Sequence, residues 1–161
     1  MFSLGLSKSI QKKVDKQIIE TFNVEEFTFT EVRIDLEITN TLPSAFRKDN
    51  LFKIETDESF LGYAYISKAF GKVDYFDYLV LFDKDLIILK TKILVYREDY
   101  GGEIGSKRWL KQFVGKTHND DLKYGDNIAA ISGATISVKV MTKAMNDLLK
   151  SIKILHSKNI L

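Results

Sequence analysis

The sequence contains no cysteine, and this absence limits its chemistry more than any other feature. Without a thiol, the chain forms no disulfide, binds no metal through thiolates and ligates no iron–sulfur cluster. Its two histidines, His118 and His156, have no partner at metal-ligand spacing. We therefore expect both histidines to be surface or loop residues, no metal site, and any redox chemistry to need a bound organic cofactor.

The sequence also lacks a strong excess of either charge. Its 24 lysines and arginines face 22 acidic residues, for a formal net charge of +2, whereas nucleic-acid binders concentrate basic residues on one surface. The early lysines are expected to form the solvated face of a helix; they are Lys8, Lys12, Lys13 and Lys16. Nothing in this charge pattern indicates a nucleic-acid partner.

Long apolar runs are missing as well. No stretch reaches the roughly 20 residues of a membrane span, and Met1–Leu6 is too short for the apolar region of a signal peptide. We expect a soluble chain that forms one domain over residues 1–161, because 45% hydrophobic residues suffice for a core. The apolar start before Ser7 fits either the remnant of a removed export signal or an ordinary lead into a helix.

Apolar periodicity predicts a helix followed by an antiparallel sheet, so the expected fold class is α+β. Helical spacing predicts a first helix over Ser7–Phe22. Alternation predicts a strand over Phe27–Ile38, with a bulge near Thr30 where its phase changes. Later segments rich in β-branched and aromatic residues are linked by turns too short for parallel crossovers; they are Leu51–Glu55, Phe60–Phe70, Tyr75–Phe82 and Leu86–Tyr96.

Glycine is concentrated after this sheet. Six of the nine glycines lie beyond Tyr96, at positions 101, 102, 105, 115, 125 and 133. Because glycine permits close backbone approach, the region from Glu98 to Thr135 is expected to surround a ligand. A short helix over Lys107–Phe113, capped by Ser106, interrupts this region, and we expect its Trp109 to be buried rather than to cover a ligand.

A long helix follows the segment SGATIS at residues 132 to 137. Its apolar residues recur every three or four positions and predict one buried stripe of Val138, Met141, Met145, Leu148, Ile152 and Leu155. Small residues before a helix N-terminus allow a phosphate to reach free backbone N–H groups, with Thr135 beside it. The alternative is that Ser132 is simply the helix N-cap.

The order of these segments resembles the FMN-binding domain family, known from flavin subunits of ion-pumping quinone and ferredoxin reductases. The resemblance covers residues 51–152 and leaves residues 1–50 as an N-terminal helix and strand extension. Its elements are a strand with Gly62 and Tyr63, then YREDYGGEIG at 96 to 105, WLKQFVGK at 109 to 116, and SGATIS at 132 to 137.

This resemblance implies that a flavin transferase joins FMN through its phosphate to Thr135. It also implies that two segments hold the cofactor. One supplies Glu98, Gly101, Gly102, Glu103 and Gly105, and the other supplies Ser132, Gly133, Ala134, Thr135, Ile136 and Ser137.

The chain departs from the family pattern at three positions. Asp99 and Tyr100 stand where threonine and proline are typical, so the local loop is expected to differ. Ala129 stands three residues before Ser132, where the family usually has an aspartate. If the transferase reads that aspartate, Ala129 weakens covalent attachment of FMN.

Three functions remain open from the sequence. The first is an electron-transfer module that passes electrons to a redox partner protein or a membrane electron-transfer complex. The second is a free-standing FMN-dependent reductase, against which the chain offers few proton donors beyond Glu98, Glu103 and His118. The third is a fold relative that has lost flavin and acts as a binding or structural module. The family suggests the cell envelope or periplasmic face, with the cytoplasm as the alternative.

Overall fold

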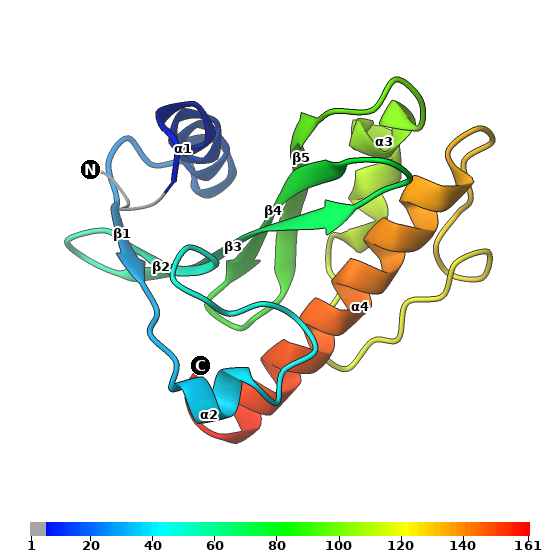
Figure 1. The fold of residues 1–161 in the computed structure, drawn as a ribbon. Helices are drawn as coiled ribbons and strands as arrows, with labels where there is room; N and C mark the ends of the chain where they lie inside the picture. The colour runs from blue at the N-terminus through cyan, green and yellow to red at the C-terminus, as the bar shows by residue number, and fades with distance from the viewer. Residues whose placement is uncertain (1–5) are drawn as a thin grey trace.

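A five-stranded antiparallel sheet separates two layers of helices (Figure 1). The computed structural model describes residues 6–161. The apolar start before Ser7, for which the sequence left two explanations open, lies almost wholly outside these residues. Each strand pairs with its neighbours in the sequence, in the order β1-β2-β3-β4-β5. The strands are β1 (Thr28–Glu31), β2 (Leu51–Glu55), β3 (Phe60–Phe70), β4 (Tyr75–Asp83) and β5 (Ile88–Tyr96).

Helix α1 (Lys8–Phe22) covers one face of this sheet. Ser7 caps the helix, because its hydroxyl accepts a hydrogen bond from the Ile10 N–H at 3.2 Å. Val14 and Ile18 are fully buried against apolar residues of all five strands, which confirms the predicted first helix.

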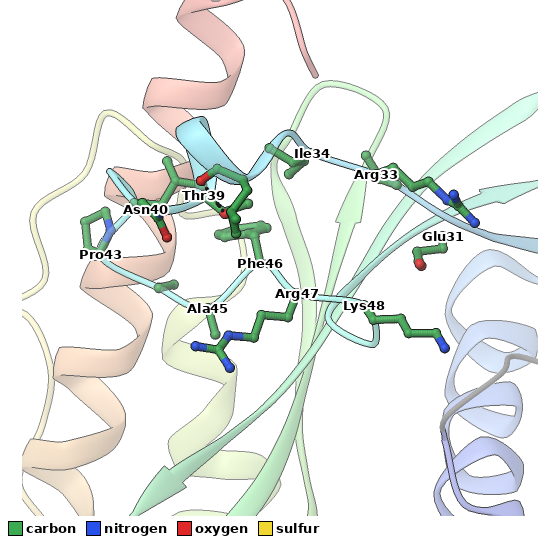
Figure 2. A pocket seen from close by; sticks show the side chains of 14 residues that line it. Glu31, Arg33, Ile34, Thr39, Asn40, Pro43, Ala45, Phe46, Arg47 and Lys48 are labelled. Atoms are coloured by element: carbon green, nitrogen blue, oxygen red, sulfur yellow. Dashed lines mark hydrogen bonds between the residues drawn. The ribbon is translucent and has the colours of Figure 1, made fainter.

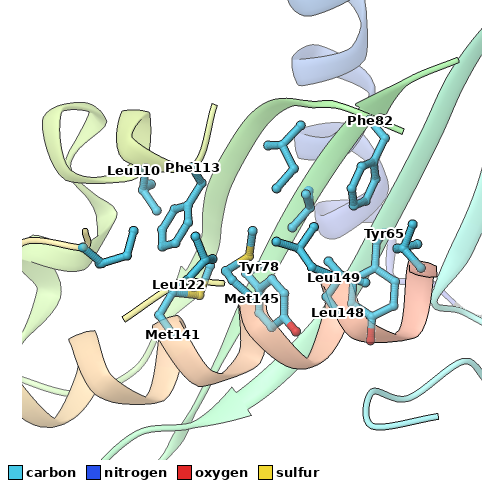
Figure 3. Close-up of a cluster of buried hydrophobic side chains, with 14 of the residues drawn as sticks. Tyr65, Tyr78, Phe82, Leu110, Phe113, Leu122, Met141, Met145, Leu148 and Leu149 are labelled. Carbon is cyan, nitrogen blue, oxygen red and sulfur yellow. The ribbon is translucent and has the colours of Figure 1, made fainter. Parts of the chain in front are cut away.

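Helix α4 (Thr135–Ser157) covers the other face. All six residues of its predicted apolar stripe are fully buried. Figure 3 shows Met141, Met145 and Leu148 packed towards Tyr65 and Tyr78 of the sheet. Since each such side chain contributes about 1.5–3 kcal/mol when buried, the position of α4 on the sheet is strongly fixed.

Strand β4 explains how one sheet serves both layers. Phe76, Tyr78 and Val80 belong to the core beneath α4, whereas Leu79 and Leu81 belong to the core beneath α1. This alternation is the period of two that places successive side chains on opposite faces.

A short helical segment follows β5 and lies against the α4 side. It consists of η1 (Gly102–Gly105), α3 (Lys107–Leu110) and η2 (Lys111–Phe113). The Ser106 hydroxyl accepts from the Trp109 N–H at 3.2 Å, which confirms the predicted cap. Trp109 is only 4% exposed, so its predicted burial is also confirmed.

The predicted strand over Phe27–Ile38 is wrong in its second half. Strand β1 ends at Glu31, and α2 (Leu36–Thr39) follows. The β2 partner begins at Leu51, whose carbonyl accepts from the Val32 N–H, so no pairing strand remains for residues beyond Val32. The predicted bulge near Thr30 is also wrong, because β1 pairs with β2 in unbroken register.

No helix among residues 6–161 is long and apolar enough to cross a membrane.

Folding brings the two histidines together, which the sequence analysis did not predict. The His118 and His156 rings lie 5.2 Å apart between centroids. The Nδ1 atom of His118 is buried and has no hydrogen-bond partner. Burial, His156 and Lys153 lower the pKa of His118, with burial as the largest cause.

We predict that this pair makes stability fall in mild acid. The pKa of His118 is lower in the folded chain than in the unfolded chain, where it is about 6.5, so the unfolded chain binds the proton first. The stabilisation from neutral His118 is complete above that unfolded pKa and is lost as the pH falls from there through the lower pKa of the folded chain. Urea unfolding from pH 7.5 to 5.5 should show a steeper decline for the parent than for His118→Gln. Parallel declines would contradict the assignment.

Candidate functional site

A cavity of about 500 Å³ lies where the β3–β4 turn, the loop after β5 and the start of α4 meet. Its volume falls within the range of about 300–1,000 Å³ that is typical of sites for small organic molecules. The three segments contribute residues 72–73, 98–101 and 133–137 respectively.

Thr135 lies at this cavity as the first residue of α4. It is exposed, and its hydroxyl forms no hydrogen bond within residues 6–161. The N-cap of α4 is Ala134, and no side chain caps the helix. The first-turn N–H groups and the positive end of the helix dipole are therefore available to an anion.

The alternative interpretation of Ser132 as the N-cap is wrong. Ser132 lies in a turn two residues before Ala134, and the Ala134 N–H is bonded to the Ile131 carbonyl. Gly133 follows Ser132 with a φ of +84°, a left-handed conformation that suits glycine. This turn separates the Ser132 side chain from the helix that it was expected to cap.

A hydrogen bond between Tyr96 and Ser137 joins the end of β5 to the first turn of α4. Their hydroxyl oxygens are 2.9 Å apart, and the Tyr96 hydroxyl also lies 2.6 Å from the Tyr100 carbonyl. Because that carbonyl can only accept, Tyr96 donates to it and Ser137 donates to Tyr96. Ser137 is 4% exposed, so its hydroxyl is both buried and committed.

The Tyr96 and Ser137 hydroxyls leave no room for a side chain at Gly101. A Cβ atom at this position would lie 2.7 Å from the Tyr96 hydroxyl and 2.8 Å from the Ser137 hydroxyl. The φ of Gly101 is +84°, which also favours glycine. The glycine-rich loop is thus held closely against the start of α4.

Glu98 orders the β3–β4 turn. Its carboxylate accepts from the backbone N–H of Lys72 at 2.9 Å and from that of Asp74 at 3.4 Å. This arrangement places Lys72 and Val73 at the cavity.

Three apolar side chains at the cavity are unusually exposed. Val73 is 70% exposed, Tyr100 85% and Ile136 46%. Large apolar residues that gather at an exposed hollow are typical of ligand or partner sites. They come from three separate segments, so only the fold brings them together.

The structure brings seven of the eleven predicted site residues to this cavity: Glu98, Gly101, Gly133, Ala134, Thr135, Ile136 and Ser137. Ser132, Gly102, Glu103 and Gly105 do not line it. The sequence analysis missed Lys72 and Val73, which no motif marks, and also Tyr96, although YREDYGGEIG begins with it.

Two side chains hold the backbone of Ala129. The Trp109 indole N–H donates to the Ala129 carbonyl at 2.7 Å, and the Gln112 side-chain carbonyl accepts from the Ala129 N–H at 2.7 Å. The Ala129 side chain remains exposed. Trp109 therefore supports the segment before SGATIS and does not line the cavity.

A larger cavity of about 890 Å³ lies under the segment from Glu31 to Lys48 (Figure 2). Its cationic groups do not converge, because Arg47 points away from Arg33 and Lys48 in this view. Within residues 6–161, no three His, Cys, Asp or Glu side chains are placed to hold a metal ion. We therefore assign no second site to this larger cavity.

Residues 71–150 match the family model described as the FMN-binding domain. The chain belongs to the FMN-binding domain family. The match begins at the β3–β4 turn, ends within α4, and so includes every residue that lines the Thr135 cavity. FMN is therefore the cofactor that this domain binds. No curated protein matches the chain.

The residues present fit such a cofactor. The uncapped N–H groups and exposed hydroxyl at Thr135 suit a phosphate, and the apolar side chains of Val73, Tyr100 and Ile136 suit a flat aromatic ring. Lys72 adds one cation to the cavity of the FMN-binding domain.

We predict that Tyr96 and Ser137 stabilise the domain as a unit. Tyr96→Phe should lower the free energy of unfolding by about 1–3 kcal/mol, because it leaves the buried Ser137 hydroxyl without its acceptor. In a double-mutant cycle with Ser137→Ala, measured by urea unfolding, the two costs should be non-additive by about 0.5–3 kcal/mol. Tyr96→Phe and Ser151→Ala should be additive, because Ser151 lies about four helical turns beyond Ser137 on α4 and bonds instead to Ser44 and Asp147. Additivity in both pairs would refute the hydrogen-bonded unit.

Proposed function

We propose that this protein is an electron-transfer flavoprotein whose FMN is joined through its phosphate to the Thr135 hydroxyl. Bound FMN supplies one- and two-electron redox chemistry, which the side chains of this cysteine-free sequence do not supply. The proposal depends chiefly on the different environments of three nearby hydroxyl groups.

The SGATIS segment offers Ser132, Thr135 and Ser137 as acceptors for the phosphate. Ser137 is buried and donates its proton to Tyr96, and Ser132 does not line the cavity. Thr135 combines an exposed, unbonded hydroxyl with a position at the cavity and at an uncapped helix start. This contrast supports Thr135 as the attachment site.

The attachment step requires FAD and a flavin transferase. The Thr135 Oγ attacks the phosphorus on the riboflavin side of the FAD pyrophosphate, the bridging P–O bond breaks, AMP leaves, and the threonine proton is released. The new phosphoester would lie at the N-terminus of α4, where backbone N–H groups and the helix dipole favour negative charge.

The walls of the cavity support a carrier rather than a stand-alone reductase. Catalysis on a small substrate needs a positioned proton donor or acceptor of suitable pKa. Of the candidates named from the sequence, Glu103 and His118 do not line the cavity, and Glu98 is bonded to the β3–β4 turn. Asp99 is the only other acidic residue in the lining.

The same walls would leave part of the flavin accessible to another protein. Val73 and Tyr100 remain largely exposed at the mouth of the cavity. We propose that electrons pass there to a redox partner protein or a membrane electron-transfer complex.

We predict that Thr135→Val abolishes covalent flavin and preserves the fold. Valine keeps the β-branched shape but removes the hydroxyl. Intact mass and in-gel flavin fluorescence after co-expression with a flavin transferase should show no attachment to this variant. The parallel variant Thr135→Ser, which keeps a hydroxyl, should still carry covalent flavin. Ser132→Ala should remain fully modified, with a stability change within about 0.5 kcal/mol, because Ser132 does not cap α4. Retained attachment in Thr135→Val would assign the cofactor to another residue.

We also predict that Ala129→Asp speeds transfer of FMN to Thr135. Trp109 and Gln112 bind only the backbone at this position, and the side chain is exposed. The substitution should therefore change the free energy of unfolding by less than about 0.5 kcal/mol. Initial rates of transfer from FAD should be compared with those of Ala130→Asp, a neighbouring exposed control. Equal rates for Ala129→Asp and the parent would show that this chain is recognised without the aspartate.

A further inference from the structure

A row of lysines runs along the solvent side of helix α1. Lys8, Lys12 and Lys16 recur every four residues and so lie along one line of the helix surface. Lys13 lies beside this line, one turn before Lys16. All four are exposed, as predicted, and none forms an ion pair within residues 6–161. Like charges at this spacing repel each other, so the row favours an anionic partner.

The sheet adds three more lysines to the same side of the molecule. Lys90 and Lys92 of β5 pair with two β4 leucines that belong to the core beneath α1. Lys68 comes two residues after Ile66, a β3 residue of the same core. Because alternate residues of a strand share a face, these three lysines are on the face of the sheet that α1 covers. They too lack an ion pair within residues 6–161.

Helix α1 and strand β5 meet within this group of charges. The Lys13 Nζ donates to the carbonyl of Leu94 at 2.8 Å, and Leu94 is two residues beyond Lys92. The lysines of the helix and of the sheet therefore form one continuous surface. We name it the lysine face and define it by seven residues: Lys8, Lys12, Lys13, Lys16, Lys68, Lys90 and Lys92.

Acidic residues do not balance the lysine face. On α1, Asp15 accepts from the Gln11 side-chain amide at 2.7 Å, which leaves Glu20 as the one exposed acidic residue of the helix. Asp77 of β4 is buried and pairs with Arg97 at 2.7 Å. The other acidic residues on this side of the sheet lie at strand ends; they are Glu31 and Asp83.

Two exposed aromatic rings continue this side of the sheet at the β3–β4 hairpin. Phe70 and Tyr75 pair directly across the strands and are 49% and 50% exposed. Their rings pack edge to face, with centroids 4.9 Å apart. They share the strand face of Lys68, which is two residues before Phe70. Exposed aromatic rings beside lysines are typical of protein surfaces that enter the headgroup region of a bilayer.

We propose that the lysine face docks on a bilayer that contains anionic phospholipid, with Phe70 and Tyr75 in the headgroup region. The lysines are spread over a helix and three strand positions, which matches a plane of lipid phosphates better than a single small anion. Each lysine near such a surface adds to the attraction. The Thr135 cavity lies at the start of α4, across the sheet from α1 (Figure 1), so docking leaves it open.

The composition of the lysine face favours a bilayer over a nucleic acid. Arginine is the side chain whose planar fork binds phosphates and base edges in two places at once. All seven cations of the face are lysines, and the nearby Arg97 is bonded to Asp77 and to the Tyr75 carbonyl. Lysine ammonium groups act as flexible point charges, which suit the diffuse attraction of a charged lipid surface.

Vesicle co-sedimentation of the full-length protein tests the proposal without any need for bound flavin. Vesicles of equal parts phosphatidylcholine and phosphatidylglycerol should bind at least tenfold more tightly than vesicles of phosphatidylcholine alone. Raising the salt from about 0.1 M to 1 M, which shortens the Debye length from about 10 Å to 3 Å, should weaken this binding at least tenfold. Equal binding to both vesicles, or binding to a DNA duplex but not to the anionic vesicles, would overturn the proposal.

Charge variants locate the contact. Replacing Lys12 and Lys16 together by glutamine should weaken binding to the anionic vesicles at least fivefold, since both lie in the row on α1. The matched control makes the same double change at Lys150 and Lys153, exposed lysines of α4 in the opposite layer, and should stay within twofold of the parent. Equal weakening by the two pairs would show attraction by net charge alone and would overturn the proposal.

The absence of cysteine allows each side of the molecule to be labelled separately. A fluorophore that responds to polarity, attached to Phe70→Cys, should shift to the blue when anionic vesicles are added. The control Leu36→Cys, at an α2 residue that is 74% exposed, should not shift. No shift at position 70, or a shift at Ile136→Cys in its place, would remove the hairpin aromatics from the bilayer and contradict the proposed orientation.

Discussion

The packing of α4 on the sheet is the constraint on which the candidate site depends. The buried stripe from Val138 to Leu155 anchors the helix over most of its length. Thr135 therefore stands at a fixed point beside the ends of β3, β4 and β5, even though the turn before it is exposed. A rigid helix that begins at the cavity places its hydroxyl and N–H groups more accurately than a loop would.

Polar contacts complete what this packing begins. The Tyr96 and Ser137 hydroxyls join β5 to the first turn of α4, and Gly101 fits only because it has no side chain. Glu98 holds the β3–β4 turn in the same way from the other side. The three segments around the cavity are thus linked to the sheet, while the start of α4 itself is left without a cap. That combination of rigid surroundings and unsatisfied N–H groups suits a phosphate.

Much of the fold could be predicted because its signals are local and strong. The run of aromatic and β-branched residues in β4 specifies a strand, and the three-to-four spacing in α4 specifies a helix and its buried face. The end of β1 could not be predicted, since the alternation continues to Ile38 but the partner strand begins only at Leu51. A strand needs a neighbour, and the identity of that neighbour is not local information.

The candidate site shows the same division. Thr135 and Gly101 lie in motifs with recognisable composition, whereas Lys72 and Val73 reach the cavity only because the β3–β4 turn folds against Glu98. Ser132 has the composition of an N-cap, but Gly133 turns the chain and delays the helix to Thr135. His118 and His156 meet only through tertiary packing.

The mass and visible spectrum of the intact protein, produced together with a flavin transferase, test the account most directly. The account predicts a mass increase of one FMN less one water, with flavin colour that stays with the chain in denaturant and maps to the peptide containing Thr135. Flavin colour that is lost on denaturation would contradict covalent attachment. A colourless protein of unmodified mass, produced alongside a transferase that modifies another substrate, would contradict the proposed function.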